Sequence, residues 1–471
     1  MNSSYKRLNN DDINHFRFIC GDDGLIEAEE EKRDYGHDYT EDLLFMPEVV
    51  VTPKNTDQVS QIMRYCHEHH IPVTPRGAGT GLSGGALPVH QGVVLSTEKL
   101  NRILKIDEKN FQVTLEPGVI NEQLREAVEE KGLFYPPDPA SKGSCFIGGN
   151  LAENSGGPKA VKYGVTKDYV LNLEVVLPNG EIIWTGANVL KNSTGYNLTQ
   201  LMIGSEGTLG IITKVVLRLI ARPSQNLLLL ASFNDLTSPC EAVSIILNSG
   251  ITPSALEFME RNAVEWSMRY SDVVLELEPK MESILLIELD GNDIERLYGE
   301  AERLNEILEA HGCINVLFAD SDLEKERLWK VRRVCGEAVH AHSVYKEEDT
   351  VVPRYELPRL LQAVKDIGKK YDFESVCYGH AGDGNLHVNI LKGNLDEDAW
   401  NKTIKDGIRE IFQTCHDLGG TLSGEHGIGW VQKEYMDIVF EPVHFDLMKG
   451  IKKVFDPTGI LNPGKIFPES D

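Results

Sequence analysis

The stretch of this chain with the clearest capacity for chemistry runs from Tyr378 to Ile390 and contains two histidines, His380 and His387, seven residues apart. On a single straight strand, an odd separation directs two side chains to opposite faces of a sheet. The intervening Gly382-Asp383-Gly384 permits the backbone to reverse, so both imidazoles can face one point from two short strands. Because neutral imidazole is the commonest metal ligand in proteins, the stretch indicates a candidate metal site.

A divalent ion needs at least one further ligand. The obvious donors are Glu425 and His426, which glycines flank within Ser423–Gly429. Asn389 shares the face of His387 because it lies two residues further along the strand. Two ordinary histidines are the alternative, and the spacing alone leaves both interpretations open.

Three glycine-rich stretches with almost no charge precede this region. The first, Pro75–Ala86, has five glycines in twelve residues and contains Gly79-x-Gly81-x-x-Gly84. A Rossmann fingerprint requires a helix to begin inside the glycine run, whereas here a strand, Val93–Ser96, is expected next. Such a loop can still hold a pyrophosphate with successive backbone amides. With Ile147–Gly157 and Leu201–Ile212, it predicts several loops that line one elongated ligand.

Composition limits the classes of function. The 471 residues exceed one hydrophobic core, so two or three domains are expected. The net charge of −26 argues against nucleic acid or an anionic membrane as the main partner. An anionic substrate would therefore need a local basic pocket.

Compartment signals point to the cytoplasm. No apolar run approaches the roughly 20 residues of a membrane helix, and the first residues lack the apolar core of a signal peptide. The eight cysteines are scattered without a Cys-x-x-Cys pair, which excludes a recognisable iron–sulfur or zinc-ribbon motif and indicates reduced thiols.

The periodicity predicts a helical lead-in over the first 45 residues and then a strand–helix–strand unit over 47–74, with Asn55 or Thr56 capping its helix. A hairpin is expected over 173–184, turning at Pro178-Asn-Gly180. After residue 224 the pattern becomes α+β with antiparallel, ferredoxin-like character. It includes one long charged helix from Leu323 to about Ala341 and a short strand over 350–352.

Six motifs stand in one order along the chain: Pro75-Arg-Gly-Ala-Gly-Thr-Gly-Leu-Ser-Gly-Gly, Ile147-Gly-Gly-Asn, Gly204-Ser-Glu-Gly-Thr-Leu-Gly, Gly379-His-Ala-Gly-Asp-Gly-Asn-Leu-His, Ser423-Gly-Glu-His-Gly and Phe455-Asp-Pro-Thr-Gly-Ile-Leu-Asn-Pro-Gly-Lys. From about Pro47 to Lys465, the chain resembles the FAD-linked D-2-hydroxy-acid dehydrogenases of the vanillyl-alcohol oxidase superfamily. That group includes D-lactate dehydrogenases, the glycolate oxidase flavoprotein subunit and D-2-hydroxyglutarate dehydrogenase.

The resemblance implies an α+β fold with three parts. Residues 1–220 would form a two-subdomain FAD-binding domain of the vanillyl-alcohol oxidase/p-cresol methylhydroxylase type. Residues 221–410 would form a ferredoxin-like α+β substrate or cap domain, and residues 411–471 would return to the FAD domain.

The resemblance also implies which residues line FAD. They are Arg76, Gly77, Gly79, Thr80, Gly81, Leu82, Ser83, Gly84, Pro137, Asp138, Ser141, Gly148, Gly149, Asn150, Asn154, Ser155, Gly157 and Ile212. Some superfamily members attach flavin through a histidine in the first loop. Thr80 occupies the corresponding place here, so FAD is expected to be non-covalent.

For the reaction centre, the resemblance implies that His380, His387 and Glu425 hold a divalent metal, usually zinc. His426 resembles the general base, with Asn389 beside it. Arg332 and Lys346 resemble the pair that receives the substrate carboxylate. A solvated charged helix and loop is the alternative for these two cations, and whether Arg332 or its neighbour points inward is open.

The implied reaction is oxidation of a D-2-hydroxy acid, D-lactate or glycolate, to the 2-oxo acid by hydride transfer to flavin N5. Electrons would pass to an external acceptor: an electron-transfer flavoprotein, a quinone or an iron–sulfur subunit. The protein would be cytoplasmic, with peripheral membrane association through a partner and a homodimer both left open.

Several alternatives differ in class or in detail. A metal-dependent hydrolase would leave the glycine stretches unexplained. A non-enzymatic flavin-binding or nucleotide-binding module would not need Glu425 and His426 beside a histidine pair. D-2-hydroxyglutarate dehydrogenase and a flavin oxidase that uses oxygen directly are closer alternatives.

Overall fold

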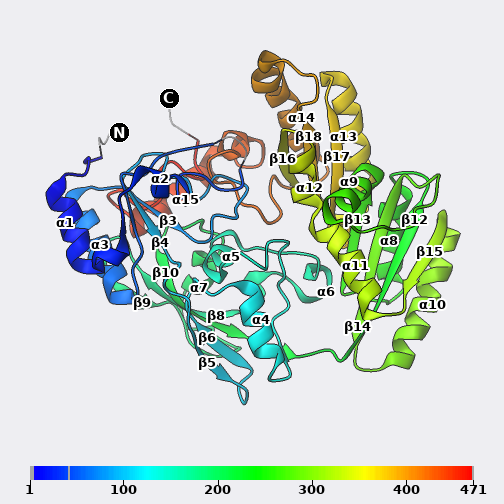
Figure 1. Ribbon diagram of the computed structural model, residues 1–471, viewed down its shortest axis with the longest axis horizontal. Coiled ribbons are helices and arrows are strands. Elements are labelled where there is room, and N and C mark those ends of the chain that lie inside the picture. Colours follow the sequence, from blue (N-terminus) through cyan, green and yellow to red (C-terminus); the bar gives the residue numbers. More distant parts are fainter. Residues whose placement is uncertain (1–4, 41–42, 469–471) are drawn as a thin grey trace. The chain divides into compact units, whose positions relative to one another are not determined.

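The computed structural model describes residues 5–40 and 43–468, and its contacts divide the chain into two compact units (Figure 1). Unit 1 comprises Met1–Ser155, Val165–Arg222 and Glu425–Asp471, and unit 2 comprises Gly156–Gly164 and Pro223–Gly424. Residues 1–4 and 41–42 of the expected lead-in lie outside the described residues. The chain enters unit 2 first over Gly156–Gly164, enters it again after residue 222 and leaves it after residue 424.

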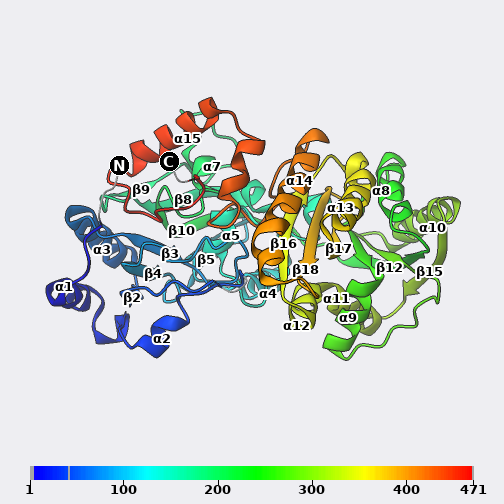
Figure 2. The ribbon, with the colours of Figure 1, turned by 90° about the horizontal axis from the view of Figure 1, so that it is seen from above.

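The first sheet of unit 1 has the order β1-β2-β4-β3, in which β2, β4 and β3 are parallel. The strands are β1 (Leu25–Ile26), β2 (Val49–Val51), β3 (Val73–Arg76) and β4 (Val93–Ser96). Helix α3 (Thr56–His69) connects β2 to β3, and the Asn55 side chain accepts a hydrogen bond from the Gln58 amide at its N-terminus. The predicted strand–helix–strand unit is therefore confirmed, and α1 (Asn10–Cys20) packs against α3 (Figure 2).

The first glycine stretch follows β3 directly and leads into β4. No helix forms within residues 77–92, all of which are described. The rejection of a Rossmann unit is therefore confirmed, because a Rossmann phosphate site needs a helix N-terminus at that point.

The second sheet of unit 1 is antiparallel, with the order β5-β6-β10-β8-β9. Its strands are β5 (Ile103–Asp107), β6 (Gln112–Leu115), β8 (Val170–Val176), β9 (Ile182–Trp184) and β10 (Ile211–Arg218). Strands β8 and β9 form the predicted hairpin. Unit 1 therefore contains two main sheets, one largely parallel and one antiparallel.

One expectation about unit 1 is wrong, because most of the second glycine stretch is a helix, α5 (Ile147–Glu153), and not a loop. A Cβ atom added to Gly148 would lie 2.7 Å from Cβ of Pro117. The glycine therefore permits close packing of a helix against a neighbouring segment.

Further helices, short strands and turns complete the chain. They are α2 (Glu29–Arg33), α4 (Asn121–Glu129), β7 (Leu133–Phe134), α6 (Ala160–Tyr163), α7 (Leu198–Met202), β11 (Ile220–Ala221) and α15 (Pro442–Phe455), with 3₁₀ turns at Asp22–Gly24, Thr166–Tyr169, Arg354–Glu356 and Lys433–Ile438.

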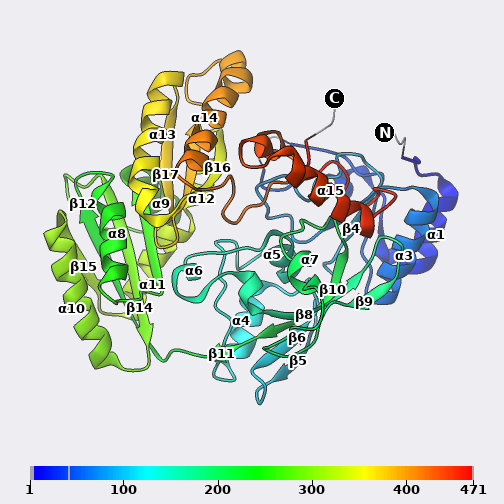
Figure 3. The ribbon, with the colours of Figure 1, turned by 180° about the vertical axis from the view of Figure 1, so that it is seen from behind.

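Unit 2 is built on one seven-stranded antiparallel sheet with the order β15-β12-β14-β13-β17-β18-β16, which confirms the α+β prediction. The strands are β12 (Gln225–Phe233), β13 (Ala255–Glu260), β14 (Ser283–Gly291), β15 (Cys313–Ala319), β16 (Tyr345–Val351), β17 (Glu374–His380) and β18 (Asn385–Leu391). Helices cover both faces of this sheet (Figures 1 and 3). They are α8 (Ser238–Asn248), α10 (Ile294–Ala310), α13 (Leu357–Tyr371) and α14 (Ile404–Asp417, after a π-helical turn at Ala399–Thr403) on one side, and α9 (Arg261–Ser271), α11 (Asp322–Arg333) and α12 (Cys335–His342) on the other.

The sequence analysis was wrong about two parts of unit 2. The single long charged helix is two helices, α11 and α12, separated at Val334. Strand β13 and helix α9 were not predicted, because β13 carries two glutamates that a buried strand would normally lack. Both are buried, and their charges are matched by Arg332 and Lys365.

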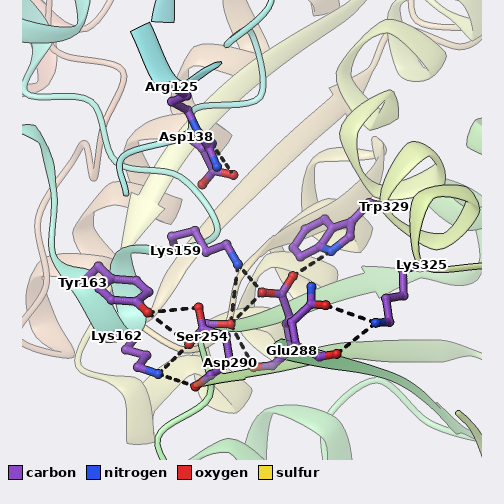
Figure 4. A network of polar contacts seen from close by, with 11 residues as sticks. Arg125, Asp138, Lys159, Lys162, Tyr163, Ser254, Glu288, Asp290, Lys325 and Trp329 are labelled. Atoms are coloured by element: carbon purple, nitrogen blue, oxygen red, sulfur yellow. Dashed lines mark hydrogen bonds and ion pairs between the residues drawn. The ribbon is translucent and has the colours of Figure 1, made fainter. Parts of the chain in front are cut away.

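A buried polar network ties Gly156–Gly164 to the sheet of unit 2 (Figure 4). Lys159 forms an ion pair with Glu288 of β14. The same carboxylate accepts hydrogen bonds from Ser254 Oγ at 2.8 Å and Trp329 Nε1 at 2.9 Å. One carboxylate therefore satisfies three buried donors from three separate segments.

Replacing Glu288 by Ala should destabilise unit 2 strongly, because the Lys159 ammonium would stay buried without its partner. Loss of one partner of a buried ion pair costs about 3–5 kcal/mol. Urea unfolding monitored by tryptophan fluorescence measures this loss. Glu282→Ala, at an exposed position next to the same strand, should change the unfolding free energy little. Equal stability of the two variants would contradict this account of the network.

Candidate functional site

The three glycine stretches meet in unit 1. A Cβ atom added to Gly77 would lie 3.6 Å from the amide nitrogen of Gly149, which brings the first stretch to α5. The third stretch also contacts α5, because the amides of Gly204 and Glu206 donate to the carbonyls of Leu151 and Ala152 at 3.0 and 2.9 Å. These contacts place the three stretches around one region.

The C-terminal segment also reaches this region. Asn462 donates through Nδ2 to the carbonyls of Gly85, at 3.0 Å, and Glu206, at 2.8 Å. Lys465 Nζ donates to the carbonyl of Leu87. Asn462 therefore links the first and third glycine stretches, and Lys465 holds the residue that follows Ala86.

The first glycine stretch presents a row of backbone amides without protein partners. Among the described residues, none of the amides from Gly77 to Ser83 donates a hydrogen bond to a protein acceptor. Gly79 and Gly84 adopt φ values of +75° and +71°, which L side chains rarely adopt. Successive free amides in such a loop form a concave site that favours an anion.

Buried side-chain atoms around this loop also lack partners within the described part of the chain. Arg76 Nη1, Ser83 Oγ and Asn150 Nδ2 are donors of this kind, and Asp38 Oδ2 and Glu153 Oε2 are acceptors. Buried polar groups are nearly always hydrogen-bonded, since leaving one unsatisfied costs about 1–3 kcal/mol. Free amides for a pyrophosphate and unsatisfied polar side chains around them therefore fit FAD, the cofactor that the motifs imply.

A group of buried ionisable residues lies under the same loop. Burial and the neighbouring Glu206 raise the pKa of Glu153 well above its ordinary range. Burial lowers the pKa of Lys465 to about 7, although nearby carboxylates offset part of the change. Glu206 accepts hydrogen bonds from the amides of Ile428, at 2.8 Å, and Gly429, at 2.6 Å. Glu153 is therefore the acid expected to keep its proton at neutral pH.

The other predicted FAD residues are placed as follows. The Asp138 carboxylate lies 3.1 Å from Arg125 Nη1 (Figure 4), and the carbonyl of Pro137 accepts a hydrogen bond from Asn121 Nδ2 at 3.3 Å. Asn154 caps the Lys167 amide at 2.9 Å, and Ser155 donates through its amide to Asn150. Ile212 lies on β10, and Ser141 lies in the turn that precedes α5. Gly157 belongs to unit 2 and is not grouped with the other glycines.

In unit 2 the two histidines lie on paired strands, as the intervening glycines predicted. In the register of β17 with β18, His380 pairs with Asn385 and Tyr378 pairs with His387. Cross-strand partners share a face of the sheet, so both imidazoles are on one face, and their ring centroids are 5.3 Å apart. Both side chains are buried.

Polar groups surround His387 on that face. Its Nδ1 atom lies 3.6 Å from carboxylate oxygens of both Glu347 and Asp349 on the adjacent strand β16. Asn389 is 0% exposed, and neither Nδ2 nor Oδ1 of its amide has a partner among the described residues. An unsatisfied buried amide beside a histidine pair indicates a site for a polar ligand.

The sequence analysis missed Glu257, which lies against His380 on the same face. Both Glu257 carboxylate oxygens are 2.9 Å from His380 Nδ1, and one is also 2.7 Å from Arg332 Nη2. Arg332 is buried, whereas Arg333 is half-buried with its guanidinium over the Trp329 ring. Arg332 is therefore the inward-pointing member of the pair.

The structure does not bring Lys346 to Arg332. Strand β16 pairs with β18 without a register shift, so Lys346 points to the face opposite Glu347 and Asp349. Its ammonium lies 4.7 Å from the Trp400 ring centroid, on the side that α14 covers. Lys346 points away from Arg332 because successive side chains of a regular strand alternate between the two faces of the sheet.

Glu425 and His426 lie where the chain passes from unit 2 to unit 1. On the unit 2 side, Asp349 accepts hydrogen bonds from Ser423 Oγ at 2.8 Å and from the Gly424 amide at 2.9 Å. On the unit 1 side, the Ile428 amide is held by a carboxylate. Both ends of this short peptide are therefore anchored.

Unit 1, with its two sheets and its row of backbone amides for an anion, and the separate α+β unit are the parts expected of a two-domain flavin-binding oxidoreductase. Comparison with known proteins identifies the same class. The family described as "FAD binding domain" matches residues 47–186, and "FAD linked oxidases, C-terminal domain" matches residues 222–466. The chain belongs to this family of FAD-linked oxidases.

The chain is similar to individual relatives over nearly its full length. The glycolate oxidase subunit GlcD of Bacillus subtilis is 40% identical over 453 residues, 95% of each chain. A D-lactate dehydrogenase of Anaerostipes hadrus is 39% identical over 470 residues, 98% of each chain. The solved structure of p-cresol methylhydroxylase with substrate bound has a TM-score of 0.79 at 18% identity, with 98% of each chain covered, and shows the fold.

Two further expectations can be compared with the structure. All eight cysteines are free, and seven of them are buried. Over the described residues, no helix combines the length and apolar character needed to cross a membrane.

Replacing Glu153 by Gln should stabilise the protein increasingly as pH rises. The pKa of Glu153 is raised in the folded state from an ordinary value of 4.5, so the folded protein retains a proton that the unfolded chain releases. Between those two pKa values, stability falls with pH by up to about 1.4 kcal/mol per unit. The glutamine variant has no such proton, so its stability does not fall with pH for this reason. The difference in melting temperature between variant and wild type should therefore grow from pH 5 to pH 8. Thermal unfolding measures it, with the exposed Glu126→Gln as control, and a pH-independent difference would contradict the assignment.

Proposed function

We propose that this protein oxidises a D-2-hydroxy acid, D-lactate or glycolate, to the 2-oxo acid by transferring a hydride to FAD. Membership of the FAD-linked oxidases supports the cofactor, and the names of the two relatives support the substrate class. The observation that carries the proposal is the buried histidine pair beside the unsatisfied amide of Asn389, since an oxygen of a bound ligand would satisfy that amide next to the two imidazoles.

FAD is held without a covalent bond, because Thr80 stands where a linking histidine would be needed. The backbone amides from Gly77 to Ser83 would donate hydrogen bonds to the pyrophosphate, with Arg76 as the adjacent cation. When bound, FAD would supply the electron acceptor for the C2 hydrogen, which leaves the substrate as a hydride. The chain's own contribution is to hold the cofactor and to exclude water from it.

His380, His387 and Glu425 are the proposed ligands of a divalent metal, and each can offer one ligand atom. Two imidazoles and a carboxylate are a donor set that zinc accepts, and three protein ligands leave positions open for a substrate. Glu425 follows Gly424 by one peptide bond, and Gly424 is fixed to Asp349 in the unit that carries the histidines. A metal bound there would act as a Lewis acid toward the substrate hydroxyl.

The remaining polar residues take separate parts of the substrate. His426 removes the hydroxyl proton as general base. Arg332 receives the carboxylate, which explains how a protein with a net charge of −26 admits an anion. The Asn389 amide donates to a substrate oxygen, and Lys346 is left out because it lies on the other face of the sheet.

The bound cofactor would need an external acceptor for its electrons, such as an electron-transfer flavoprotein, a quinone or an iron–sulfur subunit. The scattered cysteines offer no iron–sulfur motif of the chain's own. A cytoplasmic protein that docks on a partner at the membrane is consistent with this requirement.

Anaerobic mixing with D-lactate, L-lactate, glycolate and D-2-hydroxyglutarate should bleach the flavin with D-lactate or with glycolate. Acid precipitation of the same preparation should release the flavin into the supernatant. Absorbance near 450 nm measures both. Bleaching by D-2-hydroxyglutarate alone would move the assignment to that substrate, and rapid reoxidation by oxygen would identify an oxidase. Flavin that none of the four acids bleaches would overturn the proposal.

Glu425→Gln and His426→Asn should separate metal binding from base catalysis. Glu425→Gln should lower metal content, since it removes one of three ligands. His426→Asn should retain metal and FAD but reduce its flavin about 10² to 10⁴ times more slowly, because a general base contributes a factor of that order. Metal analysis and stopped-flow bleaching measure the two effects, with reoxidation by an artificial acceptor as control. Wild-type bleaching in His426→Asn would remove His426 as the base.

A further inference from the structure

We infer that Glu257 is a positioning residue for the metal site: it fixes the ring and tautomer of His380 so that the lone pair for the metal lies on Nε2. This inference rests on the proposed function, because it needs a metal at His380. Nothing in the sequence motifs marks Glu257, which lies 123 residues before His380 on a strand with a mixed pattern.

The contact is built by the register of two strands, β13 and β17. Phe258 pairs with Gly379 across β13 and β17, so the preceding residue, Glu257, faces His380 across the same pair of strands. Both carboxylate oxygens lie 2.9 Å from Nδ1. An ionised carboxylate only accepts hydrogen bonds, so Nδ1 carries the ring proton and donates it to Glu257. The lone pair of the imidazole is then on Nε2.

Burial makes the interaction strong and selective. Glu257 is 0% exposed, Arg332 4% and His380 6%. Water therefore cannot replace the carboxylate, and the opposite tautomer would put the Nδ1 lone pair against a negative charge. Second partners of this kind orient metal-binding histidines and raise their basicity.

The ion pair with Arg332 explains how the Glu257 carboxylate can be buried in the core and still accept a hydrogen bond from His380. The Arg332 Nη2 atom lies 2.7 Å from Glu257, and the guanidinium packs 5.2 Å from the Tyr378 ring centroid. The ion pair offsets the desolvation of both charges. Arg332 therefore supplies the cation that this carboxylate needs, and His380 has only to donate its Nδ1 proton.

Glu257→Gln tests the inference with nearly unchanged shape, since the glutamine carbonyl can still accept from Arg332. We expect zinc binding to weaken about 10- to 100-fold, the usual effect of losing such a partner, while FAD content stays at the wild-type level. Competition with a chromophoric zinc chelator measures the affinity, a readout that does not depend on turnover.

Glu260→Gln is the matched control. Glu260 lies on the same strand, is buried and pairs with a cation, Lys365, at 2.7 Å. It is three residues from Glu257 and therefore on the opposite face. Zinc affinity should be unchanged in this variant. Equal loss in both variants, or no loss in Glu257→Gln, would overturn the inference.

A second measurement needs no folded variant at position 257. In protein labelled with ¹⁵N-histidine, the ring proton of His380 should be on Nδ1, with the resonance assigned from its absence in His380→Ala. A proton on Nε2 would overturn the inference. Wild-type protein that binds no zinc would instead refute the metal site itself, and the ring-proton measurement would still decide the role of Glu257.

Discussion

Buried charge in the sheet of unit 2 is the constraint on which much of its structure depends. Three glutamates on the central strands β13 and β14 are almost fully buried: Glu257, Glu260 and Glu288. Each is paired with a cation from another segment: Arg332 on α11, Lys365 on α13 and Lys159 near α6, respectively. Removing either partner would leave a bare charge in the core, so each pair fixes a helix or segment to one face of the sheet.

In unit 1, by contrast, buried polar groups around the first glycine loop have no partners among the described residues. Within residues 5–40 and 43–468, the first glycine loop has backbone amides without protein acceptors, and Arg76, Ser83 and Asn150 have buried donors without partners. Such groups are costly in an ordinary core. Their concentration around one loop, while the flanking strands β3 and β4 are regularly paired, is a property of a surface built for a polar cofactor and not of a poorly packed one.

The sequence was sufficient where local chemistry decides the structure. The Asn55 cap, the hairpin at Pro178-Asn-Gly180 and the reversal between the two histidines each depend on residues close together in the chain. It was insufficient where a distant partner decides. Strand β13 was missed because its glutamates become acceptable only through distant cations.

Strand register accounts for what was wrong or missed in the candidate site. Lys346 belongs to a recognisable motif, but alternation along β16 turns it away from the histidines. Glu257 belongs to none, but its register with β17 places it on His380. Glu425 and His426 lie on a peptide that is anchored through backbone amides to Asp349 on one side and Glu206 on the other. The proposed site residues are therefore held in place by carboxylates that take no part in the proposed reaction. Such positioning residues can be recognised only when the strand pairing is known.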